Sequence, residues 1–371
     1  LLTVFSLLLS SLVFAESPLL VERVSSGALP AASERLPKTP MVTDLSAMGR
    51  EPGIHGGDIN LLMARSKDTR MLTVYGYARL VGYTPSLELQ PDIALRVDIE
   101  NDQIFTFHLR PGHRWSNGKP FTSEDFRYYW EDIALNEFLS PFGPPEALLV
   151  NGEPPSVKII DKHTVRYSWP APNPLFAPAL AAARPLYIYA PAHYLRGFHA
   201  SYVAEEKLKA MVEDAGVRNW AGLHTRYGHQ YKFDNPDLPT LQPWFCVTPA
   251  PSERFIFERN PYFHRTDSKG QQLPYLDRVI VNIGSSGLIP AKTGAGESDL
   301  QARYLRLDNY PFLMEGGERN NFSVRLWQMG VGSQMAIYPN LNTTDDAWRT
   351  LTRDVRFRRA LSLAIDRDEI N

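Results

Sequence analysis

The residues from 104 to 134 constrain the fold more than any other part of the chain. Apolar side chains alternate along IFTFHL, residues 104–109, which predicts a β-strand with one strongly apolar face. Pro111-Gly112 forms a tight turn, and Thr122 is placed to cap a helix that carries acidic residues in its first turn. The buried face of that helix is marked by apolar residues at helical spacing: Phe126, Tyr129, Trp130, Ile133 and Ala134.

The remaining chain continues to alternate strand and helix patterns. Further strands are predicted at residues 156–160, 164–169, 254–259, 278–283 and 323–329. A helix is expected from Tyr202 to Ala215, ended by Gly216, and a long polar loop is expected over residues 227–243. This alternation favours α/β or α+β lobes over an all-helical bundle.

The first 15 residues, LLTVFSLLLSSLVFA, contain no charged side chain and end in the small residue Ala15. This pattern is typical of a secretory signal and predicts a partial signal peptide at residues 1–15. Glu16 follows, where a lipid-anchored bacterial protein would need a cysteine. We therefore expect a free periplasmic protein. After residue 15, no stretch approaches the roughly 20 apolar residues that are needed to cross a bilayer.

The carboxyl-terminal residues predict helices. Asp354 is placed as a cap, and one face of the following helix is apolar: Phe357, Ala360, Leu361, Ala364 and Ile365. Asp366 and Glu369 then form a D-x-x-E capping pattern, which predicts another helix. Because the sequence stops at Asn371, we expect that the last lobe is incomplete.

Composition excludes several classes of protein. Lys and Arg (39) nearly balance Asp and Glu (41), so the formal charge of -2 provides no field that would attract nucleic acid. Cys246 is the only cysteine, which excludes an intrachain disulfide and a zinc site of several thiolates. The nine histidines are scattered, and we expect no metal site and no cofactor. A monomer is expected.

Four motifs carry a resemblance to a known family. They are FTFHLRPGHRWSNGKPFTSEDF (105–126), RNPYF (259–263) with LPYLDRVIV (273–281), GAGESDL (294–300) and DVRFRRALSLAIDRDEI (354–370). In this order and at this separation they resemble the extracytoplasmic solute-binding proteins of family 5, the peptide and nickel binding components of ABC importers. Gln242-Pro243-Trp244 departs from the family's usual Gly-Pro-Tyr.

The resemblance implies an α/β fold of the periplasmic binding protein-like type II class, with two lobes joined by crossing strands. We expect lobe I at residues 16–299, with an inserted subdomain at about 85–235, and a hinge crossing followed by the start of lobe II at residues 300–371. Asp299 to Leu307 is the candidate first crossing. The implied function is capture of a peptide-like or other small solute, with delivery to a permease and, through it, to ATPase subunits.

Candidate ligand-binding residues are few. In the predicted turn MARSKD, residues 63–68, Arg65 could bind a carboxylate, and Ser66 stands beside it. Tyr75 follows in the first lobe, and Gln334 and Tyr338 are candidates after the proposed crossing. For each residue alone, a surface or core role is the more ordinary interpretation.

Two alternatives remain at the level of the sequence. A secreted hydrolase would need a catalytic motif, but the chain has no H-E-x-x-H, G-x-S-x-G or Walker loop, and only Glu297 and Asp299 resemble a pair of carboxylates. We therefore predict that the protein is not an enzyme and has no catalytic residues. A receptor or adaptor could use Trp115, Trp220 and Trp244 as anchors, although core packing is the simpler role.

Overall fold

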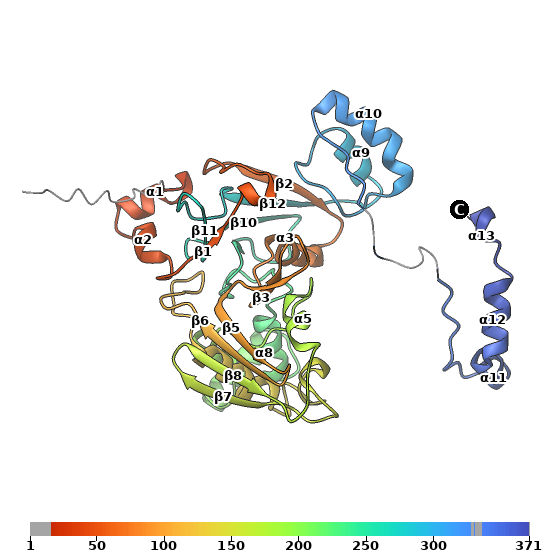
Figure 1. Cartoon of the computed structure of the whole chain (residues 1–371), viewed down its shortest axis with the longest axis horizontal. Helices are drawn as coiled ribbons and strands as arrows, with labels where there is room; N and C mark the ends of the chain where they lie inside the picture. Colours follow the sequence, from red (N-terminus) through yellow and green to blue (C-terminus); the bar gives the residue numbers. More distant parts are fainter. Residues whose placement is uncertain (1–15, 328–329, 331–335, 371) are drawn as a thin grey trace, which may run out of the picture. The chain divides into compact units, whose positions relative to one another are not determined.

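The computed structural model describes residues 16–327, 330 and 336–370 (Figure 1). The chain forms two compact units, one that ends at Ser323 and one that begins at Val324. The predicted strand at 323–329 is wrong for residues 323–327, which have no regular secondary structure, and residues 328–329 lie outside the described residues. An isolated strand is unstable without a partner for its backbone groups, and none is recorded for residues 323–327.

The first unit contains a central sheet in the order β2-β12-β10-β9. Figure 1 labels β2, β12 and β10 of this sheet. Its strands are β2 (Asp58–Met63), β12 (Arg278–Ile283), β10 (Arg254–Arg259) and β9 (Trp244–Cys246). β2 and β12 run parallel, whereas β10 is antiparallel to both of its neighbours. One face of the sheet buries a core that includes Leu61, Phe255, Phe257, Val279 and Val281. The predicted strands at 254–259 and 278–283 are thus confirmed.

A second, fully antiparallel sheet has the order β5-β6-β8-β7. It consists of β5 (Ala94–Glu100), β6 (Ile104–Leu109), β8 (Thr164–Ser168) and β7 (Ser156–Asp161), which confirms the strand at 104–109 and the following hairpin. Phe105 packs edge-on against Phe176, with ring centroids 5.0 Å apart. The alternation of IFTFHL therefore buries aromatic rings in a core separate from that of the central sheet.

Thr122 caps α4 (Ser123–Arg127), as the sequence predicts, and Asp125 completes a capping box with it. The chain then continues as the π-helical turn η3 (Tyr128–Ala134). Tyr128 is fully buried although the 3.6-residue spacing did not include it, because its ring lies against the rings of His199, Tyr202 and His224. The predicted positions Phe126, Tyr129, Trp130 and Ala134 are buried and Ile133 is partly buried.

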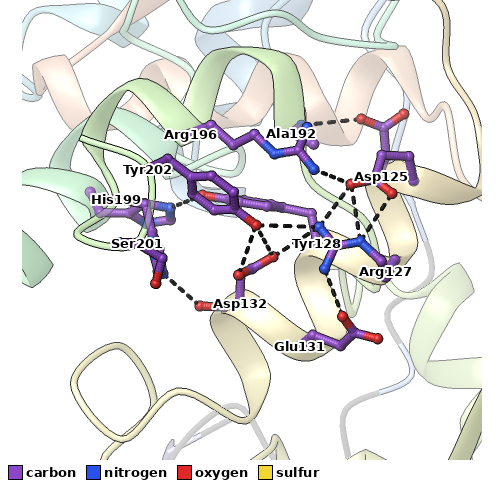
Figure 2. Close-up of polar contacts among 12 residues, drawn as sticks. Asp125, Arg127, Tyr128, Glu131, Asp132, Ala192, Arg196, His199, Ser201 and Tyr202 are labelled. Carbon is purple, nitrogen blue, oxygen red and sulfur yellow. Dashed lines mark hydrogen bonds and ion pairs between the residues drawn. The ribbon is translucent and has the colours of Figure 1, made fainter. Parts of the chain in front are cut away.

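Polar contacts join this helical segment to α6 (Ala192–Leu195) and to the turn after it, as Figure 2 shows. Arg127 bridges Glu131 at 2.7 Å and Asp132 at 3.1 Å. The Tyr202 hydroxyl donates to Asp132, with O···O distances of 3.0 and 3.1 Å. These residues hold the helices together over the aromatic core.

The other elements of the first unit are short. The small strands are β1 (Met41–Thr43), which pairs with β11 (Arg265–Asp267), and β3 (Val81–Tyr83), which pairs with β4 (Leu89–Pro91). The other helices are α1 (Pro18–Ser25), α2 (Ala32–Arg35), α3 (Met71–Gly76), α5 (Phe176–Ala181), α7 (Glu205–Asp214), α8 (Trp220–Gly228), α9 (Ile289–Gly294) and α10 (Tyr310–Asn320). The short 3₁₀ turns are η1 (Ser46–Met48), η2 (Ser66–Arg70), η4 (Glu146–Leu148), η5 (Arg196–Phe198) and η6 (Leu307–Asn309).

The expected helix at 202–215 corresponds to α7, which begins at Glu205. Gly216 has a φ of 61° at its end, a left-handed conformation that glycine adopts without strain. The expected long loop is also present, because the chain has no helix or strand between the end of α8 and the start of β9. The prediction from Tyr227 was early by two residues, since α8 ends at Gly228.

A buried carboxylate connects the second sheet to β11. Asp92 lies just before β5, and His264 and Arg265 of the β11 region bind its side chain at 2.6 and 2.9 Å. The Arg79 backbone N–H also donates to it at 2.8 Å. Asp92 therefore joins three segments that are distant in sequence.

The second unit contains α11 (Asp346–Arg353), α12 (Val355–Leu363) and α13 (Arg367–Ile370). Asp354 accepts a hydrogen bond from the Arg356 backbone N–H at 2.8 Å, and Asp366 accepts from Asp368 and Glu369, so both predicted caps are confirmed. The predicted apolar face of α12 is only partly covered: Phe357, Leu361 and Ile365 are half-buried, and Ala360 and Ala364 are exposed.

Candidate functional site at the carboxyl edge of the central sheet

Parallel strands β2 and β12 end at the same edge of the central sheet. Met63 and Ile283 are paired in register, and the Gly284 N–H donates to the Met63 carbonyl at 2.8 Å. The turn with Arg65 and Ser66 follows β2, and exposed residues 284–287 follow β12. In α/β sheets, ligands bind in crevices outside the carboxyl ends of parallel strands.

A third segment reaches this edge along the open side of β2. The Asp299 N–H donates to the Asn60 carbonyl at 2.9 Å, and the Asp299 carboxylate accepts from the Asn60 N–H at 2.6 Å. The Gln301 side chain accepts from the Leu62 N–H at 3.1 Å and donates to the Leu62 carbonyl at 2.9 Å. The amide side chain thus makes the two hydrogen bonds that the backbone of a neighbouring strand would make with β2. We call residues 64–75, 284–287 and 302–304 the carboxyl-edge wall.

Three of the predicted ligand-binding residues lie on this wall. Arg65 precedes η2 in extended backbone and is exposed, and Ser66 is half-buried. Tyr75 lies in α3 and packs against the core of the central sheet. Burial raises the pKa of Tyr75, with Arg303 acting to lower it and Asp68 to raise it, so its hydroxyl is neutral at physiological pH.

The other two predicted residues come later in the chain, after Ser323. Tyr338 belongs to the second unit and is 89% exposed. Gln334 lies outside the described residues. Their role in binding stays a prediction.

Sequence reasoning missed the residues that hold the wall together. Asp68 is 1% exposed, and it forms an ion pair with Arg303 at 3.4 Å. The Tyr304 hydroxyl donates a hydrogen bond to the same carboxylate. No local motif identifies these residues, because Asp68 reads as an ordinary turn residue and its partners lie far along the chain.

The catalytic and adaptor candidates have structural partners instead. Glu297 pairs with Lys292 at 2.6 Å, whereas Asp299 binds Asn60, so the two carboxylates have separate partners. Trp115 is fully buried in the core of the second sheet. The part of the chain that the structure describes contains no cluster of three or more His, Cys, Asp or Glu side chains suited to a metal ion.

The Gln242-Pro243-Trp244 element, which departs from the family pattern, packs into the scaffold. The Gln242 side chain is buried and donates to the Ala78 carbonyl at 3.0 Å. Pro243 lies against Gly76, where an added Cβ would be 2.8 Å from the proline ring. This element therefore packs against the end of α3, the helix that carries residues 71–75 of the carboxyl-edge wall.

Comparison with solved structures defines the fold class first. The chain superposes on an oligopeptide-binding protein OppA with a TM-score of 0.79 and 31% sequence identity, over 96% of this chain and 56% of that chain. It also superposes on the periplasmic binding protein MelB from Agrobacterium fabrum in complex with stachyose, with a TM-score of 0.63 and 25% identity, over 81% of this chain and 45% of that chain. The architecture is thus the α/β fold of periplasmic binding proteins of the OppA type.

Sequence comparison then gives the family. The family described as "Bacterial extracellular solute-binding proteins, family 5 Middle" matches residues 88–371, and the chain belongs to it. The periplasmic alpha-galactoside-binding protein of Rhizobium meliloti is 25% identical over 94% of this chain and 51% of the relative. The periplasmic oligopeptide-binding protein OppA of Salmonella typhimurium is 25% identical over 76% of this chain and 45% of the relative.

The chain thus spans about half the length of these relatives. Family membership confirms the predicted resemblance and fold class, and it removes the support for a secreted hydrolase, because the relatives are named as binding proteins. The division into lobes at residue 299 and the inserted subdomain at about 85–235 stay predictions. Among residues 16–327, 330 and 336–370, none of the helices has the length and apolarity required to span a membrane.

Proposed function

We propose that this protein is the solute-binding component of an ABC importer and that it captures an oligopeptide between two lobes in the periplasm. It then delivers the solute to a membrane permease, which works with ATPase subunits. The observation that carries the proposal is the carboxyl-edge wall, where Arg65, Ser66 and Tyr75 follow β2 at the edge where two parallel strands end in a chain of family 5.

Capture requires no chemical step. A solute that contacts both lobes binds the closed form better than the open form and shifts the population towards it. A micromolar affinity corresponds to about -8 kcal/mol, which a few hydrogen bonds and aromatic contacts supply after ordering costs. Closure then presents a loaded surface to the permease, as a monomer.

The wall residues have distinct roles in this proposal. The exposed Arg65 guanidinium binds a carboxylate through charge-assisted hydrogen bonds. The Ser66 hydroxyl donates to or accepts from a peptide group, and the neutral Tyr75 hydroxyl does the same from α3. Backbone groups beyond Met63 and Ile283 offer pairing for an extended peptide, which tolerates varied side chains.

A galactoside is the second candidate solute. Its support is that the relative named for alpha-galactosides aligns over 94% of this chain and that the solved MelB structure contains stachyose. The higher TM-score of the OppA structure, 0.79 against 0.63, favours the peptide.

The test uses the full-length protein with trialanine and with stachyose. We expect trialanine to raise Tm and to give saturable heat in calorimetry, because a ligand at 100 times its Kd stabilises the folded state by about 2.7 kcal/mol. If stachyose alone stabilises the protein, the proposed solute is a galactoside and not a peptide. If neither trialanine, stachyose nor a panel of other tripeptides and galactosides binds, the proposed function is wrong.

Site variants test the role of Arg65. Arg65→Ala should weaken trialanine binding about ten-fold and should abolish the preference for trialanine over its carboxyl amide. Arg50→Ala is the matched control, since Arg50 is another exposed arginine that lies before β2. An unchanged preference in Arg65→Ala would remove Arg65 from the site.

A further inference from the structure

We propose that Asp68, Arg303 and Tyr304, here called the Asp68 cluster, are positioning residues that hold the turn with Arg65 and Ser66 in its solute-binding geometry. The proposal rests on the proposed function, and it adds which contacts fix the position of the predicted binding residues. The cluster connects the turn after β2 to the segment that runs along the open side of β2.

Burial explains why Asp68 needs these partners. The Asp68 side chain is almost entirely buried, and a buried carboxylate requires a cation or several donors to remain in the fold. Among the described residues, the recorded ion pair of Asp68 is with Arg303, and Tyr304 supplies a hydroxyl donor. Both partners come from one dipeptide, so the turn is attached to a single point on the neighbouring segment.

The backbone conformation at Tyr304 is unfavourable and must be stabilised by contacts. Tyr304 has a φ of 64°, a left-handed conformation that costs a non-glycine residue about 1 kcal/mol or more. Such a conformation persists only when surrounding contacts determine it. Those contacts are the Tyr304 hydroxyl on Asp68, the Arg303 ion pair, and the Gln301 side chain, which donates to the Arg303 carbonyl at 2.8 Å.

A short chain of hydrogen bonds transmits the position of Asp68 to the predicted binding residues. The Asp68 N–H donates to the Arg65 carbonyl at 2.9 Å, and the Thr69 hydroxyl donates to the Ser66 carbonyl at 2.9 Å. Arg65 and Ser66 are therefore bonded through their backbones to the two residues at the buried end of the turn. Release of Asp68 would let this turn move and would change where the Arg65 guanidinium lies.

The molecule contains a matched contact elsewhere. The Tyr275 hydroxyl donates to Asp267 at 2.7 Å, and Asp267, in β11, is as buried as Asp68. Asp267 lies in the small β1-β11 sheet, and neither residue of this pair is part of the carboxyl-edge wall. Tyr275→Phe thus removes the same kind of bond without touching the wall.

The experiment compares Tyr304→Phe, Asp68→Asn and Tyr275→Phe in the full-length protein. Affinity is measured by calorimetry with trialanine, or with stachyose if that is the solute that stabilises the wild type. Tm and amide hydrogen exchange at residues 64–68 are measured on the same samples. We expect all three variants to lower Tm, but only Tyr304→Phe and Asp68→Asn to weaken binding, by about ten-fold, and to speed exchange at residues 64–68.

Several results would overturn the positioning role. Unchanged affinity in Tyr304→Phe and Asp68→Asn with a lowered Tm would show that the cluster serves stability alone. An equal loss of affinity in Tyr275→Phe would show general loosening instead. Unchanged exchange at residues 64–68 would refute the inference even without a solute. Failure of the wild type to bind any tested solute would refute the proposed function, which is a separate outcome because the exchange result does not depend on binding.

Discussion

Replacement of Asp92 by alanine should destabilise the protein severely. The Asp92 carboxylate accepts four hydrogen bonds, from the Arg79 backbone, from His264 and twice from Arg265, at distances between 2.5 and 2.9 Å. Burial alone would raise the pKa of Asp92, but Arg265 and His264 hold it well below its usual range. The carboxylate is thus charged in the folded state and fully compensated.

The magnitude follows from what the substitution leaves behind. Asp92→Ala would remove the acceptor of the buried Arg79 N–H and of the buried His264 ring. It would also remove the anion that pairs with the Arg265 cation, which is 19% exposed and keeps the Tyr77 carbonyl as an acceptor. Removal of one member of a buried ion pair costs about 3–5 kcal/mol. Because domains are stable by only about 5–15 kcal/mol in total, the variant should be near the limit of folding at 37 °C.

The assay is urea unfolding of the full-length protein, followed by tryptophan fluorescence. Asp98→Ala is the control, because Asp98 also pairs with a histidine and an arginine, His108 at 2.9 Å and Arg96 at 3.0 Å, but its side chain is 45% exposed. An exposed pair of this kind contributes about 0–1 kcal/mol. If Asp92→Ala and Asp98→Ala lower the free energy of unfolding equally, the reasoning from burial is wrong.

Two further predictions concern buried titratable groups. Burial lowers the pKa of His224 to about 4. Below the unfolded pKa of about 6.5, the unfolded state therefore binds a proton that the folded state does not bind. The free energy of unfolding thus falls as the pH drops from about 6.5 towards 4. His224→Gln should lose less stability between pH 7.5 and pH 5 than the wild type or the His163→Gln control, and an equal loss would contradict the assignment. Burial raises the pKa of Cys246 to about 12, so the folded protein should react slowly with a thiol reagent at pH 8 and rapidly in urea. Fast labelling of the folded protein would contradict this.

Local patterns were sufficient where neighbouring residues decide the structure. The strand at 104–109, the Thr122 cap and the hairpin that follows depend on alternation, a hydroxyl and a short polar loop, all within a few residues. The burial of Tyr128 could not be found in this way, because the residues that cover its ring, His199, Tyr202 and His224, lie about 70–95 residues further along the chain.

In the candidate site, too, contacts between residues that are distant in the sequence were not predicted. Arg65 and Ser66 were predicted from a turn in the first lobe, with Arg65 suited to a carboxylate, and Tyr75 as the tyrosine that follows it. The structure places all three after β2, and their role in binding stays a prediction. Asp68, Arg303 and Tyr304 were missed, since their contact joins residues that are far apart in the sequence. A single sequence contains no signal for which buried carboxylate meets which distant cation. The Asp92 contacts with His264 and Arg265 were missed for the same physical reason.

Charge at the wall bears on the choice between the two candidate solutes. The whole chain has a formal charge of -2, yet the wall carries Arg65, Lys67, Arg70 and Arg303 against the single acid Asp68. Since Asp68 is buried and paired with Arg303, the other three cations retain their field, and this field attracts carboxylates more than the hydroxyls of a neutral sugar. A free peptide is a zwitterion, and its terminal carboxylate can pair with these cations when its ammonium group lies away from them, whereas stachyose has no charged group. The local accumulation of positive charge in a slightly acidic protein therefore favours the peptide on physical grounds that are independent of the relatives' names.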